Sequence, residues 1–247
     1  MSIKRYFATA DNTITNAFNN DLTTRATGSN AGAADIVEIF SIYGQATTSS
    51  TEASRALVQF DTSQISTDRT NGLIPASGEV SFYLKLFNVS HIETTPRGYT
   101  LAIQAVSQSW EEGNGLDLDS RQDLTYDMVG SNWIKRSSNN SWSAQGGDFH
   151  AAPVFTATFD KGTEDLEVNV TSLVEQWIVG TKQNYGFGVF LSGSFESGTT
   201  SYYTKKFFAR SSEFFFKRPV LEARFNTDLK DDRGDFYSSS SLAPERS

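Results

Sequence analysis

Short runs of alternating apolar and polar residues recur along the chain, and turn-forming glycine, serine, asparagine and aspartate separate them. In the segment 80–87 (VSFYLKLF), Val80, Phe82, Leu84 and Leu86 share one face. A period of two is the pattern of a half-buried β-strand, because successive side chains point to opposite faces of a sheet. Its repetition between turns predicts an all-β chain that folds as an antiparallel two-sheet β-sandwich, or jelly roll.

The other predicted strands share this alternation and are rich in phenylalanine, tyrosine, valine and threonine, which suit a pleated, half-buried surface. They are Ile36–Tyr43, 55–60, Tyr99–Val106, 154–159, 185–191, 202–209 and Val220–Phe225.

One segment has helical rather than strand spacing. Residues 170–182 (VTSLVEQWIVGTK) place Leu173 and Trp177 on one face, with Thr171 as a cap and Gly180 as a stop. We therefore expect one principal short helix, which covers an open end of the sandwich.

The chain shows no internal repeat and no clear linker, so residues 1–227 are predicted to form a single β-sandwich domain. Residues 228–247 (DLKDDRGDFYSSSSLAPERS) are polar and rich in serine, which predicts an extended C-terminal arm. Such an arm gains order where a partner supplies apolar surface. Phe236, Tyr237 and Leu242 are therefore its candidate assembly residues.

The chain offers few residues for catalysis. It has no cysteine and only two histidines, which excludes disulfides, thiolate zinc sites and cysteine nucleophiles. No nucleophile elbow, phosphate-binding loop, dinucleotide fingerprint or HExxH zinc motif occurs. We therefore expect a non-enzymatic protein without an organic cofactor. The alternative is a glycosidase in which Glu111 or Glu112 pairs with Asp117 or Asp119 across a sugar.

The longest stretch without a strand pattern is 107–152, and long irregular loops often carry function. Within it, 110–123 (WEEGNGLDLDSRQD) clusters carboxylates on a glycine-rich loop, which suits calcium with its six to eight oxygen ligands. The candidate ligands are Glu111, Glu112, Asp117 and Asp119. Their spacing is not that of an EF-hand, so a solvated acidic loop is the alternative.

The formal net charge of −8 disfavours a nucleic-acid partner, because an acidic surface repels phosphate backbones. The segment 202–218 (YYTKKFFARSSEFFFKR) interleaves cations with aromatic residues, as a platform for single-stranded bases does. Two amphipathic strands joined by a Ser-Ser turn explain the same pattern, and the net charge favours this interpretation. No apolar stretch follows Lys4 and Arg5, and no run approaches roughly 18 apolar residues, so we expect neither a signal peptide nor a membrane span.

Five stretches carry a resemblance to a known family. They are 55–65 (RALVQFDTSQI), 108–112 (QSWEE), 166–177 (LEVNVTSLVEQW), 184–191 (NYGFGVFL) and 207–225 (FFARSSEFFFKRPVLEARF). Their order and spacing resemble the DNRLRE family, a jelly-roll β-sandwich whose members include carbohydrate-binding modules. Asn169 departs from the family pattern, which commonly has aspartate before the V-T of the helix start.

The resemblance implies structural roles for four residues. Arg55 is expected near the start of a strand, with Glu213 of the S-x-E motif as its partner, and such a buried pair holds two strands in register. Trp110 and Trp177 are expected to be anchors in the core or at its edge.

The chain also resembles structural proteins of marine tailed phages, especially cyanophages. The resemblance lies in 1–18 (MSIKRYFATADNTITNAF), 39–60 (IFSIYGQATTSSTEASRALVQF), 107–119 (SQSWEEGNGLDLD) and 230–245 (KDDRGDFYSSSSLAPE). It implies a virion structural protein of the head, neck, tail or fibre, with other virion proteins and further copies of itself as partners. The alternative is a carbohydrate-binding module or adhesin for host polysaccharide, which needs coplanar exposed tryptophan or tyrosine rings.

Overall fold

The computed structural model describes residues 2–91, 94–116 and 129–226. It is 42% strand and 11% helix with antiparallel strand pairing, so the predicted all-β class is confirmed. The strands are β1 (Ser2–Thr15), β2 (Ile36–Tyr43), β3 (Thr51–Phe60), β4 (Val80–Leu86), β5 (Tyr99–Val106), β6 (Lys135–Ser137), β7 (Asn140–Ser141), β8 (Phe149–Phe159), β9 (Leu166–Asn169), β10 (Phe187–Leu191), β11 (Tyr202–Phe208) and β12 (Val220–Phe225). The helices are α1 (Ser63–Thr70), α2 (Thr171–Ile178), α3 (Ser194–Ser197) and the 3-10 helix η2 (Phe215–Lys217).

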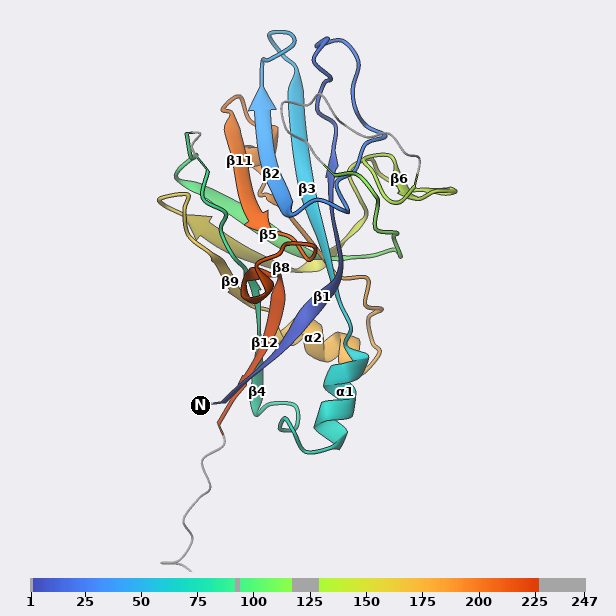
Figure 1. Ribbon diagram of the computed structural model, residues 1–247, viewed down its shortest axis with the longest axis vertical. Helices are drawn as coiled ribbons and strands as arrows, with labels where there is room; N and C mark the ends of the chain where they lie inside the picture. The colour runs from blue at the N-terminus through green and yellow to red at the C-terminus, as the bar shows by residue number, and fades with distance from the viewer. Residues whose placement is uncertain (1, 92–93, 117–128, 227–247) are drawn as a thin grey trace, which may run out of the picture.

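Ten strands form one large, nearly closed antiparallel sheet (Figure 1). Eight of them follow the order β8-β5-β10-β3-β1-β12-β4-β9, while β2 pairs with both β3 and β11. The sheet has two parts, one with β12, β4 and β9 and the other with β3, β10, β5, β8, β2 and β11. The long strand β1 joins them, since its first half pairs with β12 and its second half with β3. A register shift between Ala8 and Ala10 marks the change of partner. The end strands β8 and β9 also contact each other, which almost closes the sheet.

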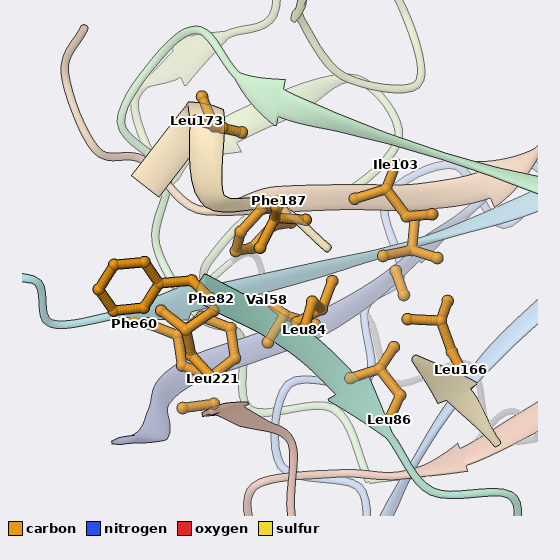
Figure 2. Packing of buried hydrophobic residues seen from close by; sticks show 14 of the residues in the cluster. Val58, Phe60, Phe82, Leu84, Leu86, Ile103, Leu166, Leu173, Phe187 and Leu221 are labelled. Atoms are coloured by element: carbon orange, nitrogen blue, oxygen red, sulfur yellow. The ribbon is translucent and has the colours of Figure 1, made fainter. Parts of the chain in front are cut away.

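The main core lies between the two parts of the sheet (Figure 2). Phe82 and Leu84 of β4 and Leu221 of β12 approach it from one part, and Val58 of β3 and Phe187 of β10 approach it from the other. Each of these side chains is fully buried. Burial alternates residue by residue along β4, as the sequence pattern predicts.

Helix α2 lies within the predicted segment but is shorter, because it ends at Ile178. Val170 takes the N-cap position that the sequence assigned to Thr171. The hydroxyl of Thr171 instead accepts a hydrogen bond of 2.8 Å from the backbone N–H of Phe82, which ties the helix to β4. Trp177 packs edge-on against Phe187 with ring centroids 4.7 Å apart.

The expectation of a single principal helix is wrong, because α1 has eight residues and equals α2 in length. Helix α1 buries only Ile65 and Asp68, so it has no apolar stripe for a sequence pattern to reveal. Polar tertiary contacts hold it instead: Asp68 accepts a hydrogen bond from the hydroxyl of Tyr6, and Arg69 forms an ion pair of 2.7 Å with Glu175 of α2. Within the described ranges, no helix is long and apolar enough to cross a membrane.

The described part of the irregular stretch 107–152 folds against the outer side of the sheet rather than into solvent. It contains the β6–β7 hairpin and the start of β8. Its tryptophans, Trp110, Trp133 and Trp142, are buried in a second core cluster with Ile14 of β1. Burial of large aromatic rings explains how a stretch with little regular structure stays packed on the sheet.

Candidate functional site: an exposed phenylalanine surface

The predicted calcium ligands lie only partly within the described residues. Both oxygens of Glu112 accept hydrogen bonds from Arg210, and one of them also accepts from the backbone N–H of Asp11. Glu111 accepts hydrogen bonds from the backbone N–H and hydroxyl of Ser138. Asp117 and Asp119 lie outside the described residues, and the described ones contain no group of three or more possible metal ligands. Calcium binding therefore stays a prediction.

Asp11 of β1 forms a buried polar cluster with Glu112 and Arg210 that the sequence did not reveal. Its carboxylate is fully buried and accepts a hydrogen bond of 2.5 Å from the backbone N–H of Arg210. Burial is the main reason that the pKa of Asp11 rises from 3.8 to about 7, and the nearby charge of Glu112 raises it further. Arg210 pairs with Glu112, and the second carboxylate oxygen of Asp11 is buried without a hydrogen-bond partner among the described residues.

Arg55 has a different partner from the one that the family resemblance implied. Its guanidinium forms two hydrogen bonds of 2.7 Å with the carboxylate of Glu196 in α3, and it donates a third to the carbonyl of Gly146. Glu213 is exposed, in the turn that follows β11. Arg55 also lies 4.9–5.7 Å from the ring centroids of Trp133, Phe149 and Phe190. The residue therefore joins β3 to α3 and to the loop that carries Trp133.

Replacing Arg55 with lysine is expected to lower the free energy of unfolding by about 2 kcal/mol, since lysine loses the bidentate pair and the planar ring contacts. Arg69 is a matched control: it makes a bidentate pair with Glu175, and its side chain has the same exposure of 18%. No aromatic ring lies against it among the described residues. Arg69→Lys should cost about 1 kcal/mol. Equal losses in urea denaturation would show that the rings around Arg55 contribute nothing.

All four tryptophans of the chain are buried, with exposed fractions of 9% or less, so none forms a surface platform for a sugar ring. Trp110 belongs to the second core cluster and donates its indole N–H to the carbonyl of Tyr185. Trp177 belongs to the main core. Exposed aromatic surface is supplied instead by Tyr203 and by Phe214, Phe215 and Phe216.

Most cations of the segment 202–218 are engaged within the fold. Lys205 is buried, and its ammonium donates hydrogen bonds to Asn88 and to the carbonyls of Gly162 and Glu164. Burial is the main reason that its pKa falls from 10.5 to about 8. Two more are paired with acids: Lys206 with Glu38 and Arg210 with Glu112. Lys217 and Arg218 form no ion pair with any described residue.

The same segment does not form the two predicted strands. Strand β11 ends at Phe208, and the chain then turns into η2 before β12. The hydroxyl of Ser212 accepts a hydrogen bond from the N–H of Phe214 at the start of this turn. Pro219 ends the turn, because a proline disfavours helical backbone in the residue before it, and Arg218 is accordingly extended. A turn, unlike a strand, leaves three consecutive phenylalanines facing outward.

The resulting phenylalanine surface consists of Phe7, Phe208, Phe214, Phe215 and Phe216. In Figure 1 its turn is the dark-red coil between β11 and β12. Phe214, Phe215 and Phe216 are 54%, 47% and 77% exposed. At about 200 Å² for a fully exposed ring, they leave roughly 350 Å² of aromatic area in solvent, about the size of the largest apolar patch on a typical monomer, which is often functional.

The rings of this surface contact one another in two groups, and within each group they are not parallel. The centroids of Phe7 and Phe215 lie 4.6 Å apart at 43°, those of Phe208 and Phe214 5.4 Å apart at 64°, and those of Phe215 and Phe216 5.5 Å apart at 83°. Lys217 and Arg218 lie over Phe208 and Phe215. Tilted rings beside cations form a rough apolar surface rather than a flat platform for sugars or bases.

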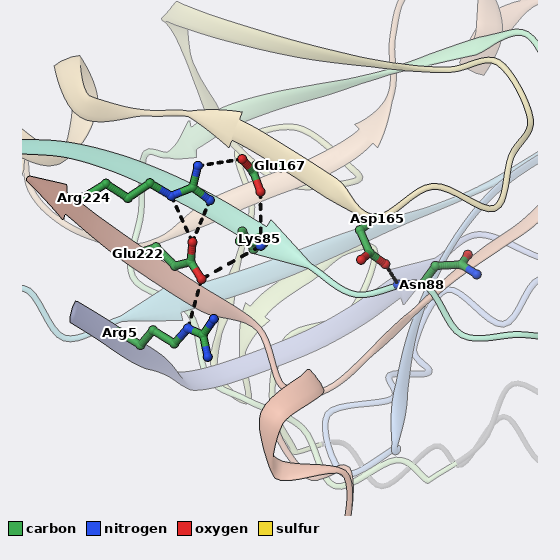
Figure 3. A network of polar contacts seen from close by, with 7 residues as sticks. All are labelled: Arg5, Lys85, Asn88, Asp165, Glu167, Glu222 and Arg224. Carbon is green, nitrogen blue, oxygen red and sulfur yellow. Dashed lines mark hydrogen bonds and ion pairs between the residues drawn. The ribbon is translucent and has the colours of Figure 1, made fainter. Parts of the chain in front are cut away.

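The outer face of the neighbouring strands, by contrast, has paired charges (Figure 3). Glu222 accepts hydrogen bonds from Arg5 and Arg224, and Glu167 accepts one from Arg224 and forms an ion pair with Lys85. The contacts of Glu167 with Arg224 and Lys85, above all the hydrogen bond from Arg224, lower the pKa of this carboxyl to about 2. The face is therefore a charge network that links four strands, and the phenylalanine surface at its end is the better candidate for binding.

No protein-family model and no curated protein sequence matches this chain. The expected assembly residues Phe236, Tyr237 and Leu242 lie outside the described residues.

Proposed function

We propose that this chain is a non-enzymatic structural protein of a tailed-phage particle, acting through protein–protein contacts with other virion proteins and with copies of itself. The observation that carries the proposal is the exposure of Phe214, Phe215 and Phe216 in one turn. Consecutive exposed phenylalanines lower the solubility of a protein, and they are typical of surfaces that a binding partner covers. The stretches that resemble phage structural proteins supply the kind of particle, which would contain the chain as a head, neck, tail or fibre component.

The proposal includes the finer architecture, a two-sheet jelly-roll sandwich. It is supported by the two parts of the sheet, whose apolar faces share one core around Phe82 and Phe187. Such sandwiches serve as rigid supports for loops and turns that bind partners. The turn that carries the phenylalanine surface is of this kind.

A carbohydrate-binding adhesin is the second candidate function, and the DNRLRE resemblance favours it. The geometry favours assembly instead, because the tryptophans are buried and the exposed phenylalanines are tilted. The engaged cations of the segment 202–218 also argue against a nucleic-acid platform. Aromatic residues and arginine are enriched at the interfaces between proteins.

The test is mass spectrometry of gradient-purified particles of the phage whose genome encodes this chain. We expect the chain in fixed proportion to the major capsid or tail proteins, in particles that have been washed at high salt. A chain found only in the soluble lysate contradicts the proposal. Binding of the purified chain to host polysaccharide, lost on Tyr203→Ala, would support the adhesin instead.

A further inference from the structure

We propose that the phenylalanine surface binds the C-terminal segment 228–247 of a neighbouring copy of this chain. The inference rests on the proposed assembly function and names the partner of its contact surface. The cations and rings of the surface, the sequence of the segment and the direction in which β12 leaves the domain support this pairing.

The charges of the two parts are complementary. Lys217 and Arg218 lie over two rings of the surface without a described carboxylate partner, whereas the cations in Figure 3 are paired with Glu167 and Glu222. The segment 228–237 (DLKDDRGDFY) has four aspartates against one lysine and one arginine, a net charge of −2. Its acidic residues supply the partners that these two cations lack.

The apolar residues are complementary as well. In the segment, Phe236 and Tyr237 directly follow the acidic residues. On the surface, Lys217 and Arg218 directly follow the exposed rings. An acidic stretch that pairs with the cations therefore brings Phe236 and Tyr237 toward Phe214, Phe215 and Phe216. Aromatic side chains in contact prefer tilted geometries, and the rings of the surface are already tilted.

The direction of β12 favours a neighbouring copy over the same chain. Phe7 of the surface pairs with Val220 at the start of β12, while Phe225 at its end pairs with Ser2. The six residues of β12 span about 17–20 Å, so the chain leaves the domain at the end away from the surface. The segment 228–247 is therefore joined to the domain at the end farther from its own phenylalanine surface, which favours the surface of a neighbouring copy as its binding site.

The experiment measures self-association of the full-length chain by sedimentation velocity over a concentration series. We expect the wild-type chain to associate and the triple variant F214S/F215S/F216S to sediment as a monomer. Lys217→Glu should weaken association at least tenfold. Adding D231K/D232K to Lys217→Glu should restore it, because the reversed charges again attract.

Two further measurements separate the possible contacts. F236S/Y237S should weaken association as strongly as the triple variant, while Val179→Ser, at another exposed apolar residue, should leave it unchanged. A photo-crosslinker at position 216 should join light to heavy copies in an isotopically mixed sample, at peptides from 228–247.

Three outcomes would overturn the inference: a monomeric wild-type chain, crosslinks confined to single copies, or F236S/Y237S variants that associate normally. The last would mean that two phenylalanine surfaces pair with each other. None of them bears on the presence of the chain in purified particles, which tests the proposed function separately.

Discussion

Replacing Phe187 with alanine is expected to lower the free energy of unfolding by about 4 kcal/mol. Phe187 is fully buried where β10, β3 and α2 meet, and its ring contacts Phe60 at 6.0 Å and Trp177 at 4.7 Å between centroids. Truncation removes the burial of the ring, breaks both aromatic pairs and leaves a cavity that the surrounding sheet cannot close. Urea denaturation monitored by tryptophan fluorescence measures the loss.

Phe216→Ala is the matched control, because it is the same substitution at a ring that is 77% exposed. At concentrations where the chain is monomeric, it should change the free energy of unfolding by no more than about 0.5 kcal/mol. A large loss at Phe216 would mean that the fold itself requires the phenylalanine surface, and exposure would then no longer indicate a partner. A small loss at Phe187 would contradict the packing around α2.

The alternation of apolar and polar residues predicted the strands that have one apolar face. It failed where the buried residues of a strand are polar. Strands β2, β5 and β12 have the predicted bounds, since each packs an apolar face on the core. Strand β1 was missed although its last residues are buried, because these include polar Asp11, Asn12 and Thr13. Asn12, for example, donates hydrogen bonds to Ser131, which no local pattern reveals.

The phenylalanine surface was misassigned to a strand for a reason visible in the sequence. Three consecutive phenylalanines cannot alternate between core and solvent, so Phe214–Phe216 never matched the period of two. The following Lys-Arg-Pro indicated the end of a turn. The partner of Arg55, in contrast, lies 141 residues away at Glu196, and only the folded chain brings the two together.

The contribution of Asp11 to the stability of the folded state should fall as the pH rises from about 4 to 7. The pKa of this carboxyl is about 7 in the folded chain and 3.8 in the unfolded chain, so between these values the folded state binds the additional proton. Its contribution to stability is complete below pH 4 and is lost as the pH rises through about 7. The difference in pKa corresponds to about 4 kcal/mol. Glu112 and Arg210 are the charged groups that face Asp11.

Asp11→Asn should abolish this pH dependence, because the amide resembles the protonated carboxyl at every pH. Its carbonyl oxygen can still accept the hydrogen bond from the N–H of Arg210. We therefore expect a variant close to wild type at about pH 4 and increasingly more stable than wild type as the pH rises to 7, by urea denaturation. Asp160→Asn, at an exposed carboxyl, should follow the wild-type curve.

Because the other ionisable groups are common to both proteins, their contributions cancel in the difference between wild type and variant. A difference that stays constant from about pH 4 to 7 would mean that Asp11 is ionised in the folded chain throughout this range, with Arg210 compensating its burial.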